Sequence, residues 1–187
     1  MQNALRDRIA LMRRRLDGQK TVAAISAQSQ LFVSPPPVCQ RLAELAGVCD
    51  TDRILEPSAG TGAILRAVRQ VAPSARCDAV EQHYDLVNYI RRNFPDTCVI
   101  HTDFLEYSPD TGYDKILMNP PFNRGCDIKH ISQALTMLNP GGVLTAVCLN
   151  GPRQERALRP LADTWEVLPR GTFAYTEVET VILRISQ

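Results

Sequence analysis

The sequence predicts an α/β fold in which a mostly parallel sheet carries helices on both faces. Short apolar strand patterns alternate with helical patterns from residue 53 to residue 161, an order typical of a parallel sheet. A glycine-rich turn follows the first strand and opens a helix, as in folds that bind a ligand beyond the ends of parallel strands. Two further strand patterns close the chain with no helix between them, so we expect a terminal antiparallel hairpin.

The individual elements follow from apolar spacing and from the proline and glycine residues at their ends. The expected strands cover residues 53–56, 77–81, 99–101, 113–119, 143–149, 165–169 and 178–185. The expected helices cover residues 37–45, 63–71, 84–92, 128–138 and 153–161. Pro73 stops the second of these helices, and Asn139-Pro140-Gly141-Gly142 closes the fourth. The sheet is therefore expected to have seven strands.

The composition indicates one compact domain. The chain has 187 residues, of which 44% are hydrophobic, and this is enough for a sizeable core. Charged residues make up 22%, which excludes a disordered or fibrous chain. No apolar run is long enough to cross a bilayer, and the first residues do not resemble a signal peptide. We therefore expect a cytoplasmic protein with no membrane partner.

The cysteines and histidines form no pattern typical of a metal site. The six cysteines are Cys39, Cys49, Cys77, Cys98, Cys126 and Cys148, and no two of them form a CxxC pair. Structural zinc needs paired ligands at short spacing, so the sequence predicts no metal and reduced, buried thiols. His83, His101 and His130 form no metal or nucleophile motif either. They are expected to lie at the surface or to be satisfied locally.

The first thirty residues differ from the rest and are predicted to form a basic helix and a linker. Leu5, Ile9, Met12 and Leu16 recur at helical spacing, and residues 1–20 carry six basic and two acidic side chains. Contact with nucleic-acid phosphates is one hypothesis for these arginines, and a solvated helical face is the other. The domain proper is expected to cover residues 31–187.

The first candidate site is the turn that follows the first strand. It is formed by Glu56, Pro57, Ser58, Ala59, Gly60, Thr61 and Gly62. Glycines let backbone N–H groups approach a ligand closely, and a helix N-terminus favours negative charge. A dinucleotide-binding turn needs a third glycine where this chain has Leu65, which argues against NAD. Glu81 ends the second strand, where an acid can accept both ribose hydroxyls of a nucleoside cofactor.

The second candidate site is Asn119-Pro120-Pro121-Phe122, which ends the apolar strand YDKILM. The two prolines fix the backbone and remove two donors, so nearby carbonyls are left to point at the crevice beyond the strand ends. An exocyclic amine of adenine is a poor nucleophile because its lone pair is delocalised into the ring. The side-chain oxygen of Asn119 and the carbonyl of Pro120 are suited to accept its two N–H bonds and favour a pyramidal nitrogen. Phe122 is suited to stack on an extruded base.

These residues resemble those of a known family. ILEPSAGTG followed by MNPPF is similar to the amino-methyltransferase branch of the class I S-adenosylmethionine-dependent methyltransferases, above all to N6-adenine DNA methyltransferases whose cofactor motif comes first. The resemblance covers roughly residues 31–187. It implies a Rossmann-like, doubly wound seven-stranded sheet with a terminal antiparallel hairpin. It also implies S-adenosyl-L-methionine as cofactor and N6 of adenine in DNA as target.

The resemblance also assigns roles by position. It implies that residues 56–62 lie under the methionine part of the cofactor and that Glu81 binds its ribose. Asp103 and Phe104 match the pair beside the cofactor adenine, with Asp103 on the amino group. Phe32, Ser34 and Pro35 belong to a segment that resembles the one covering the methionine end. Residues 119–122 match the catalytic motif.

Several alternatives stay open at this point. Related motifs occur in methyltransferases for guanine or adenine in ribosomal RNA and for a protein glutamine amide. A non-catalytic accessory subunit that binds the cofactor or nucleic acid is the alternative from another class. Only about 65 residues follow Phe122, which leaves little chain for a separate target-recognition region. The substrate is thus expected to be nucleic acid, DNA before RNA, with recognition that is weak or borrowed from a partner.

Overall fold

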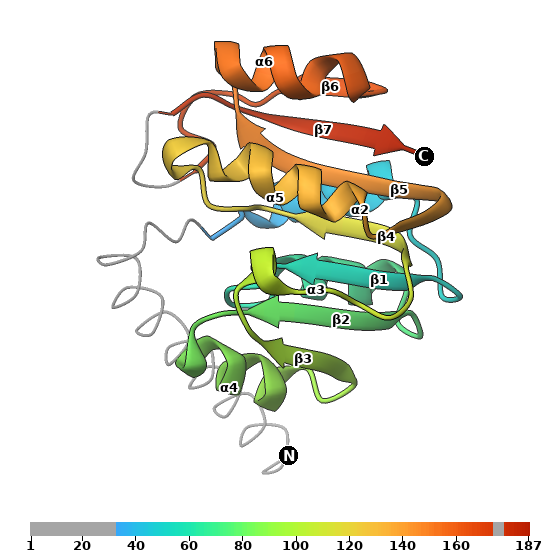
Figure 1. Cartoon of the computed structure of the whole chain (residues 1–187). Helices are drawn as coiled ribbons and strands as arrows, with labels where there is room; N and C mark the ends of the chain where they lie inside the picture. The colour runs from blue at the N-terminus through green and yellow to red at the C-terminus, as the bar shows by residue number, and fades with distance from the viewer. Residues whose placement is uncertain (1–32, 174–177) are drawn as a thin grey trace, which may run out of the picture.

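The structure contains one seven-stranded mixed sheet between two layers of helices (Figure 1). It is a computed structural model that describes residues 33–173 and 178–187. The predicted basic helix and linker, residues 1–30, and the candidate Phe32 lie outside the described residues. The strands are β1 (Arg53–Pro57), β2 (Arg76–Glu81), β3 (Thr97–His101), β4 (Tyr113–Met118), β5 (Leu138–Leu149), β6 (Thr164–Val167) and β7 (Thr180–Ser186).

The helices of the described chain alternate with the first five strands. They are α2 (Pro36–Ala46), α3 (Ala63–Val71), α4 (Tyr84–Asn93), α5 (Cys126–Leu135) and α6 (Pro152–Leu158), with 3-10 turns η1 (Phe104–Glu106), η2 (Asn123–Gly125) and η3 (Arg159–Leu161). α2 begins with proline in its first turn, where a missing N–H costs nothing. It ends at Gly47, whose φ of 62° is the left-handed conformation that closes many helices. Most predicted boundaries agree with these within two residues.

The strand order is β3-β2-β1-β4-β5-β7-β6. The first five strands run parallel, and β7 pairs antiparallel with both β5 and β6. The predicted mostly parallel sheet with a terminal antiparallel hairpin is confirmed. Because β2 lies on one side of β1 and β4 on the other, the connections diverge at the carboxyl ends of β1 and β4. Open α/β sheets bind ligands at such a position.

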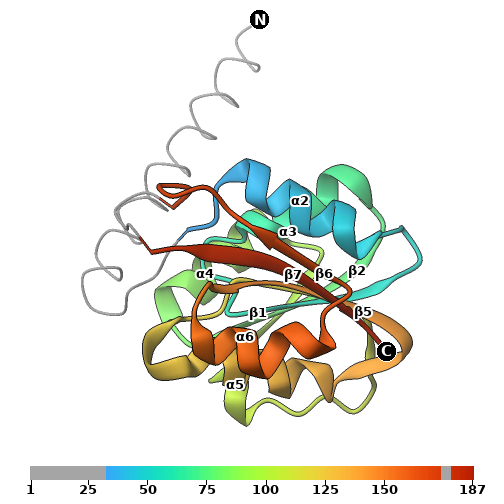
Figure 2. The ribbon, with the colours of Figure 1, turned by 90° about the horizontal axis from the view of Figure 1, so that it is seen from above.

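Apolar side chains fill both faces of the sheet. α2 and α3 cover one face, and α5 and α6 cover the other (Figure 2). The first layer is anchored by fully buried residues such as Leu42 and Leu65, and the second by Ile131 and Leu158. These two cores hold the carboxyl ends of the central strands in fixed positions, which is what a binding site at that edge requires.

The region around residues 136–142 differs from the prediction. The helix expected to reach Leu138 ends at Leu135, and β5 begins at Leu138 rather than Val143. The reason lies in the neighbouring strand, because Tyr113 pairs with Leu138 and the pairing then shifts register. The side chain of Asn139 also donates a hydrogen bond of 2.8 Å to Asp114. These contacts hold a segment rich in proline and glycine along β4.

The prediction of buried thiols holds for three of the six cysteines. Cys39, Cys77 and Cys148 are buried, and burial raises the pKa of Cys39 to about 12 and that of Cys77 to about 11. Cys49 and Cys98 are exposed, which corrects the expectation for them. In the described part of the chain, no three histidine, cysteine or acidic side chains gather as a metal site would need. No helix in that part is long and apolar enough to span a membrane.

Candidate functional site

A cavity of about 360 Å³ lies at the carboxyl ends of β1, β2 and β4, where the predicted residues converge. This size lies within the range of small-molecule sites. The predicted residues that line it are Ser34, Glu56, Ser58, Ala59, Gly60, Thr61, Glu81, Asp103, Phe104, Asn119, Pro120 and Pro121. The fold therefore brings the glycine-rich turn and the Asn-Pro-Pro motif to one cavity, although about sixty residues separate them in the sequence.

The glycine-rich turn is held in left-handed backbone conformations. Gly60 and Gly62 have φ values of 57° and 67°, which glycine adopts without strain. Ser58 also has a positive φ, of 59°, which is unusual for a residue with a side chain. The N–H of Ala59 donates to the carbonyl of Val80 at 3.0 Å, so the turn is tied to the neighbouring strand. Such local strain at a binding turn is maintained by the surrounding structure.

Glu81 is the acid that joins the two strand ends. One carboxylate oxygen accepts a hydrogen bond of 2.8 Å from the N–H of Gly60, and the other accepts one of 2.8 Å from the N–H of His83. The side chain is buried, and its carboxylate borders the cavity. A carboxylate can accept about four hydrogen bonds, so capacity remains for the hydroxyls of a ligand.

Glu56 holds the start of α3. Its carboxyl group accepts a hydrogen bond of 2.9 Å from the N–H of Leu65. Burial raises the pKa of Glu56 to about 8, and the nearby negative charge of Glu81 acts in the same direction. Burial therefore favours the neutral form of Glu56. Both acids border the cavity, and Glu81 is the one that receives two backbone donors.

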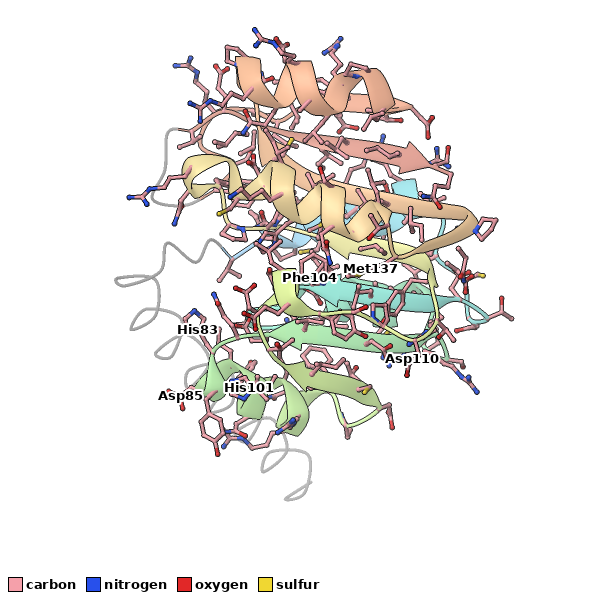
Figure 3. All side chains as sticks on the ribbon, in the orientation of Figure 1. His83, Asp85, His101, Phe104, Asp110 and Met137 are labelled. Atoms are coloured by element: carbon pink, nitrogen blue, oxygen red, sulfur yellow. The ribbon has the colours of Figure 1, made fainter. Side chains whose placement is uncertain are left out.

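Asp103 and Phe104 lie at the next strand end along the sheet. The carboxylate of Asp103 accepts a hydrogen bond of 2.9 Å from the N–H of Leu105 and so caps η1. Phe104 is buried against the sheet beside α5 (Figure 3). Together with Val80, it gives this end of the cavity an apolar wall of the kind that accepts a flat ring.

Asn119 directly follows β4, the strand on the other side of β1. Its side-chain nitrogen donates a hydrogen bond of 2.9 Å to the hydroxyl oxygen of Ser34. Ser34 is buried, and its carbonyl accepts a contact of 3.5 Å from the thiol of Cys39 in α2. The segment before α2 therefore fixes the carboxamide of Asn119. Pro120 and Pro121 continue the cavity wall from there.

Phe122, which is predicted to stack on a target base, does not line the cavity. Its ring is 9% exposed and packs edge-on against Phe173, with ring centroids 6.5 Å apart and planes at 88°. The apolar core beneath the motif attracts the ring because burial removes aromatic surface from water. Pro35, Pro57 and Gly62 do not line the cavity either. Gly62 packs so closely on Phe94 that an added Cβ would lie 2.5 Å from the ring.

His130 is a site residue that the sequence interpretation missed. It lies on α5, lines the cavity and is buried, with its Nδ1 atom 3.4 Å from the hydroxyl oxygen of Ser58. Its ring packs on Phe104 at a centroid distance of 5.4 Å. Burial lowers its pKa, against a smaller opposite effect of the charges of Asp103 and Asp127. The sequence signal for His130 was only its spacing of four residues from Cys126, which puts both on one face of a helix. Both residues line the cavity.

Solved structures share this fold. A putative RNA methyltransferase from Pyrococcus horikoshii superimposes with a TM-score of 0.70 at 18% identity, covering 85% of this chain and 87% of that one. An RNA methyltransferase from Salinibacter ruber, solved in complex with S-adenosyl-L-homocysteine, superimposes with a TM-score of 0.63 at 20% identity. It covers 82% of this chain and 92% of that one. At this level of identity the likeness shows the fold.

Three curated relatives share part of the sequence. Ribosomal RNA small subunit methyltransferase A of Chlorobium phaeobacteroides is 31% identical over 54% of this chain and 40% of its own length. Type II methyltransferase M.CvrRI of Paramecium bursaria Chlorella virus XZ-6E is 30% identical over 54% of this chain and 26% of its length. The tRNA1(Val) (adenine(37)-N6)-methyltransferase of Aliivibrio fischeri is 34% identical over 42% of this chain and 36% of its length. The chain spans less than half the length of each.

One family model covers most of the chain. The model of the methyltransferase small domain matches residues 28–174, which include the glycine-rich turn, Glu81 and the Asn-Pro-Pro motif. The match agrees with the strand order and with a ligand cavity at the carboxyl ends of the strands. The chain belongs to the methyltransferase small domain family.

Proposed function

We propose that this protein transfers a methyl group from S-adenosyl-L-methionine to N6 of adenine in a nucleic acid. The observation that supports this most strongly is the shared cavity. Asn119, Pro120 and Pro121 border the same space as Gly60 and Glu81. A methyl donor bound on one side of this cavity would lie next to the groups suited to hold an amine on the other.

S-adenosyl-L-methionine is the cofactor of these methyltransferases, and the cavity residues fit it. It supplies an electrophilic methyl group on a positively charged sulfur. Glu81 has acceptor capacity for ribose hydroxyls, and the apolar wall of Val80 and Phe104 fits an adenine ring. The backbone of the turn at Gly60 borders the cavity closely because no side chain intervenes. Asp103 also lines the cavity, and in the proposed complex its carboxylate accepts from the adenine amino group.

The chain's own contribution to the reaction is positioning. In the proposed mechanism the side-chain oxygen of Asn119 and the carbonyl of Pro120 accept the two N–H bonds of the target amine. The nitrogen then becomes pyramidal and its lone pair points toward the methyl donor. Holding both reactants in this geometry accounts for most of the rate, as orientation alone can contribute several powers of ten. The proton leaves the methylated nitrogen for solvent.

The target base must leave its stack to reach this cavity. In the proposed complex Phe122 turns away from Phe173 and stacks on the extruded base. Phe173, the present partner of Phe122, does not line the cavity. A nucleobase offers a flat face for such stacking, which favours a nucleobase over a protein amide.

The choice between DNA and RNA rests on the sequence resemblance and on the relatives. The motif order resembles DNA methyltransferases, whereas two of the three relatives above are named for RNA substrates and one is a type II enzyme. The chain spans less than half of each relative, so the substrates of those whole proteins are not assigned to it. The experiment therefore presents both nucleic acids.

Product identification tests the proposal. The protein is incubated with labelled S-adenosyl-L-methionine and, in separate reactions, with single-stranded DNA, duplex DNA, ribosomal RNA, transfer RNA and a cell-protein extract. Each product is digested and the labelled nucleoside or amino acid is identified by mass spectrometry. Label in N6-methyladenine supports the proposal. Label in methylguanine or in a glutamine amide, with none in adenine, contradicts it.

A further inference from the structure

An arginine pattern on α6 has no part in the cavity described above. Arg153, Arg156 and Arg159 recur every three residues along α6 and η3, and all three side chains are exposed. At about 100° per residue they fall within one sector of the helix surface. The buried residues Gln154 and Leu158 lie in the opposite sector. Nitrogen-tipped side chains accordingly project outward from α6 (Figure 3).

Within residues 33–173 and 178–187, the three arginines form no ion pair. None of the salt bridges between described residues includes them. Glu155 is the one acidic residue between positions 152 and 161, and it lies on the flank of the arginine sector. Arg159 extends over the ring of Trp165 at 5.6 Å, which holds its guanidinium in place. The surface therefore carries a concentrated positive charge.

Hydrogen bonds connect this surface to the catalytic edge. The buried carboxylate of Asp127 accepts from the side chain of Gln154 at 2.8 Å and from the N–H of Leu149 at 3.2 Å. The first turn of α5, the end of β5 and the first turn of α6 therefore meet at one point. β5 is the direct neighbour of β4, and Asn119 directly follows the end of β4. The starts of α5 and α6 lie at the edge of the sheet to which the β4 arrow points (Figure 1).

Two further cations follow the motif, Arg124 in η2 and Lys129 in the first half of α5. Arg124 and Lys129 are exposed, and Arg124 has a φ of 51° in the turn η2. This left-handed conformation is uncommon for a residue with a side chain, and it is followed by Gly125, which is also left-handed. The chain thus adopts a constrained turn that places a basic residue directly after residues 119–122.

We propose that Arg153, Arg156 and Arg159, which we call the arginine stripe, bind the phosphate backbone of the nucleic-acid strand that carries the target base. The stripe covers about 9 Å along the helix axis, enough for two or three successive phosphates. Guanidinium groups bind phosphates in a bidentate manner without reading sequence. The stripe positions the strand, while the cavity holds the base. This inference rests on the proposed function.

Salt-dependent binding tests the stripe without requiring methyl transfer. A fluorescent single-stranded oligonucleotide, as RNA or as DNA of the same sequence, is titrated with the full chain at several salt concentrations. Replacing all three arginines by glutamine should weaken binding about tenfold or more and reduce the slope of log affinity against log salt by about two. Binding of S-adenosyl-L-homocysteine, measured by calorimetry, should stay unchanged.

Matched variants separate the stripe from general charge effects. The control replaces Arg76 and Arg92, which are exposed at the start of β2 and near the end of α4, by glutamine. A variant changed only at Arg153 and Arg156 spares the contact of Arg159 with Trp165. Equal losses in stripe and control variants, an unchanged salt slope, or no binding of either oligonucleotide by the native protein would overturn the inference. Binding through the stripe with label found only in protein would reject the proposed substrate instead.

Discussion

The side-chain nitrogen of Asn119 donates a hydrogen bond of 2.9 Å to the hydroxyl of Ser34, 85 residues earlier in the chain. This bond places the nitrogen of the carboxamide toward α2 and its oxygen on the other side. α2, which follows the Ser34 segment, is tied to the sheet, since the hydroxyl of Thr145 in β5 donates to the carbonyl of Leu42. The orientation of the catalytic candidate is thus set by an element outside the motif.

Replacing Asn119 by alanine removes the proposed acceptor for the target amine. We expect the rate of methyl transfer to fall by about 100-fold or more, the usual cost of removing one positioning hydrogen-bonding group. Affinity for S-adenosyl-L-homocysteine should change by less than about threefold, because Gly60 and Glu81, the proposed cofactor residues, stay in place. Single-turnover transfer and calorimetry measure the two quantities. Normal transfer by this variant would contradict the mechanism.

Replacing Ser34 by alanine removes the hydroxyl, on the segment before α2, to which the side-chain nitrogen of Asn119 donates. The transfer rate should fall by about tenfold while the KM for the cofactor stays nearly constant, and threonine at position 34 should restore the rate because it keeps the hydroxyl. Ser132, exposed on α5, gives the matched serine-to-alanine control. Loss of cofactor affinity with an unchanged rate would assign Ser34 to the cofactor alone.

Replacing Glu81 by alanine removes the acceptor for the N–H groups of Gly60 and His83 together with the proposed ribose contact. Hydrogen bonds to a charged group contribute about 1.5–3 kcal/mol each, so affinity for S-adenosyl-L-homocysteine should fall by at least tenfold. Glutamine should retain part of it, since it keeps one acceptor oxygen. Alanine at the exposed Glu44 is the control in the same calorimetric titration. Unchanged affinity in the Glu81 variant would refute the assignment.

His130 should make stability depend on pH. Burial lowers its pKa in the folded chain, while the unfolded value is about 6.5. Below about pH 6.5 the unfolded chain binds the proton more readily, so the free energy of unfolding decreases on acidification until the folded group is also protonated. Glutamine at position 130 should reduce the decrease between about pH 7 and pH 5.5 in urea titrations.

A control for this effect replaces the exposed His101, which Figure 3 shows at the sheet edge below His83. Among the described hydrogen bonds, the side chain of His101 takes part in only one, of 3.0 Å between its Nε2 atom and the carbonyl of Gln82. The His101 variant should keep the native pH dependence. If both histidine variants lose it equally, the burial of His130 is not its cause.

Asp127 should be a major determinant of stability. It is fully buried and accepts from the N–H groups of Ile128 and Leu149 and from the side chain of Gln154. Alanine leaves these donors buried without an acceptor, so we expect a loss of about 2–4 kcal/mol in the free energy of unfolding. Urea denaturation measures it, with alanine at the exposed Asp110 as control. A loss below about 0.5 kcal/mol would show that the donors find other partners.

Local sequence patterns determined the order of the elements and the position of both motifs. The strand before the glycine-rich turn and the strand before Asn119 were identified because short apolar runs end at residues that cannot continue a sheet. Parallel strands in an α/β fold end at one edge, so the convergence of these motifs also followed from sequence. The position of Glu81 at the end of β2, on the same edge of the sheet, could be predicted from sequence for the same reason.

Long-range packing decided the features that no local pattern carries. Phe122 turned toward Phe173 because the core under the motif offers an aromatic partner 51 residues later in the chain. His130 entered the cavity wall only because α5 begins at the carboxyl ends of the strands, and Asp127 became a junction because three elements meet at its side chain. The sequence by itself determined which residues end the strands, since apolar spacing and prolines act over a few residues. The tertiary structure decided which side chains meet there, because those contacts depend on how whole elements pack.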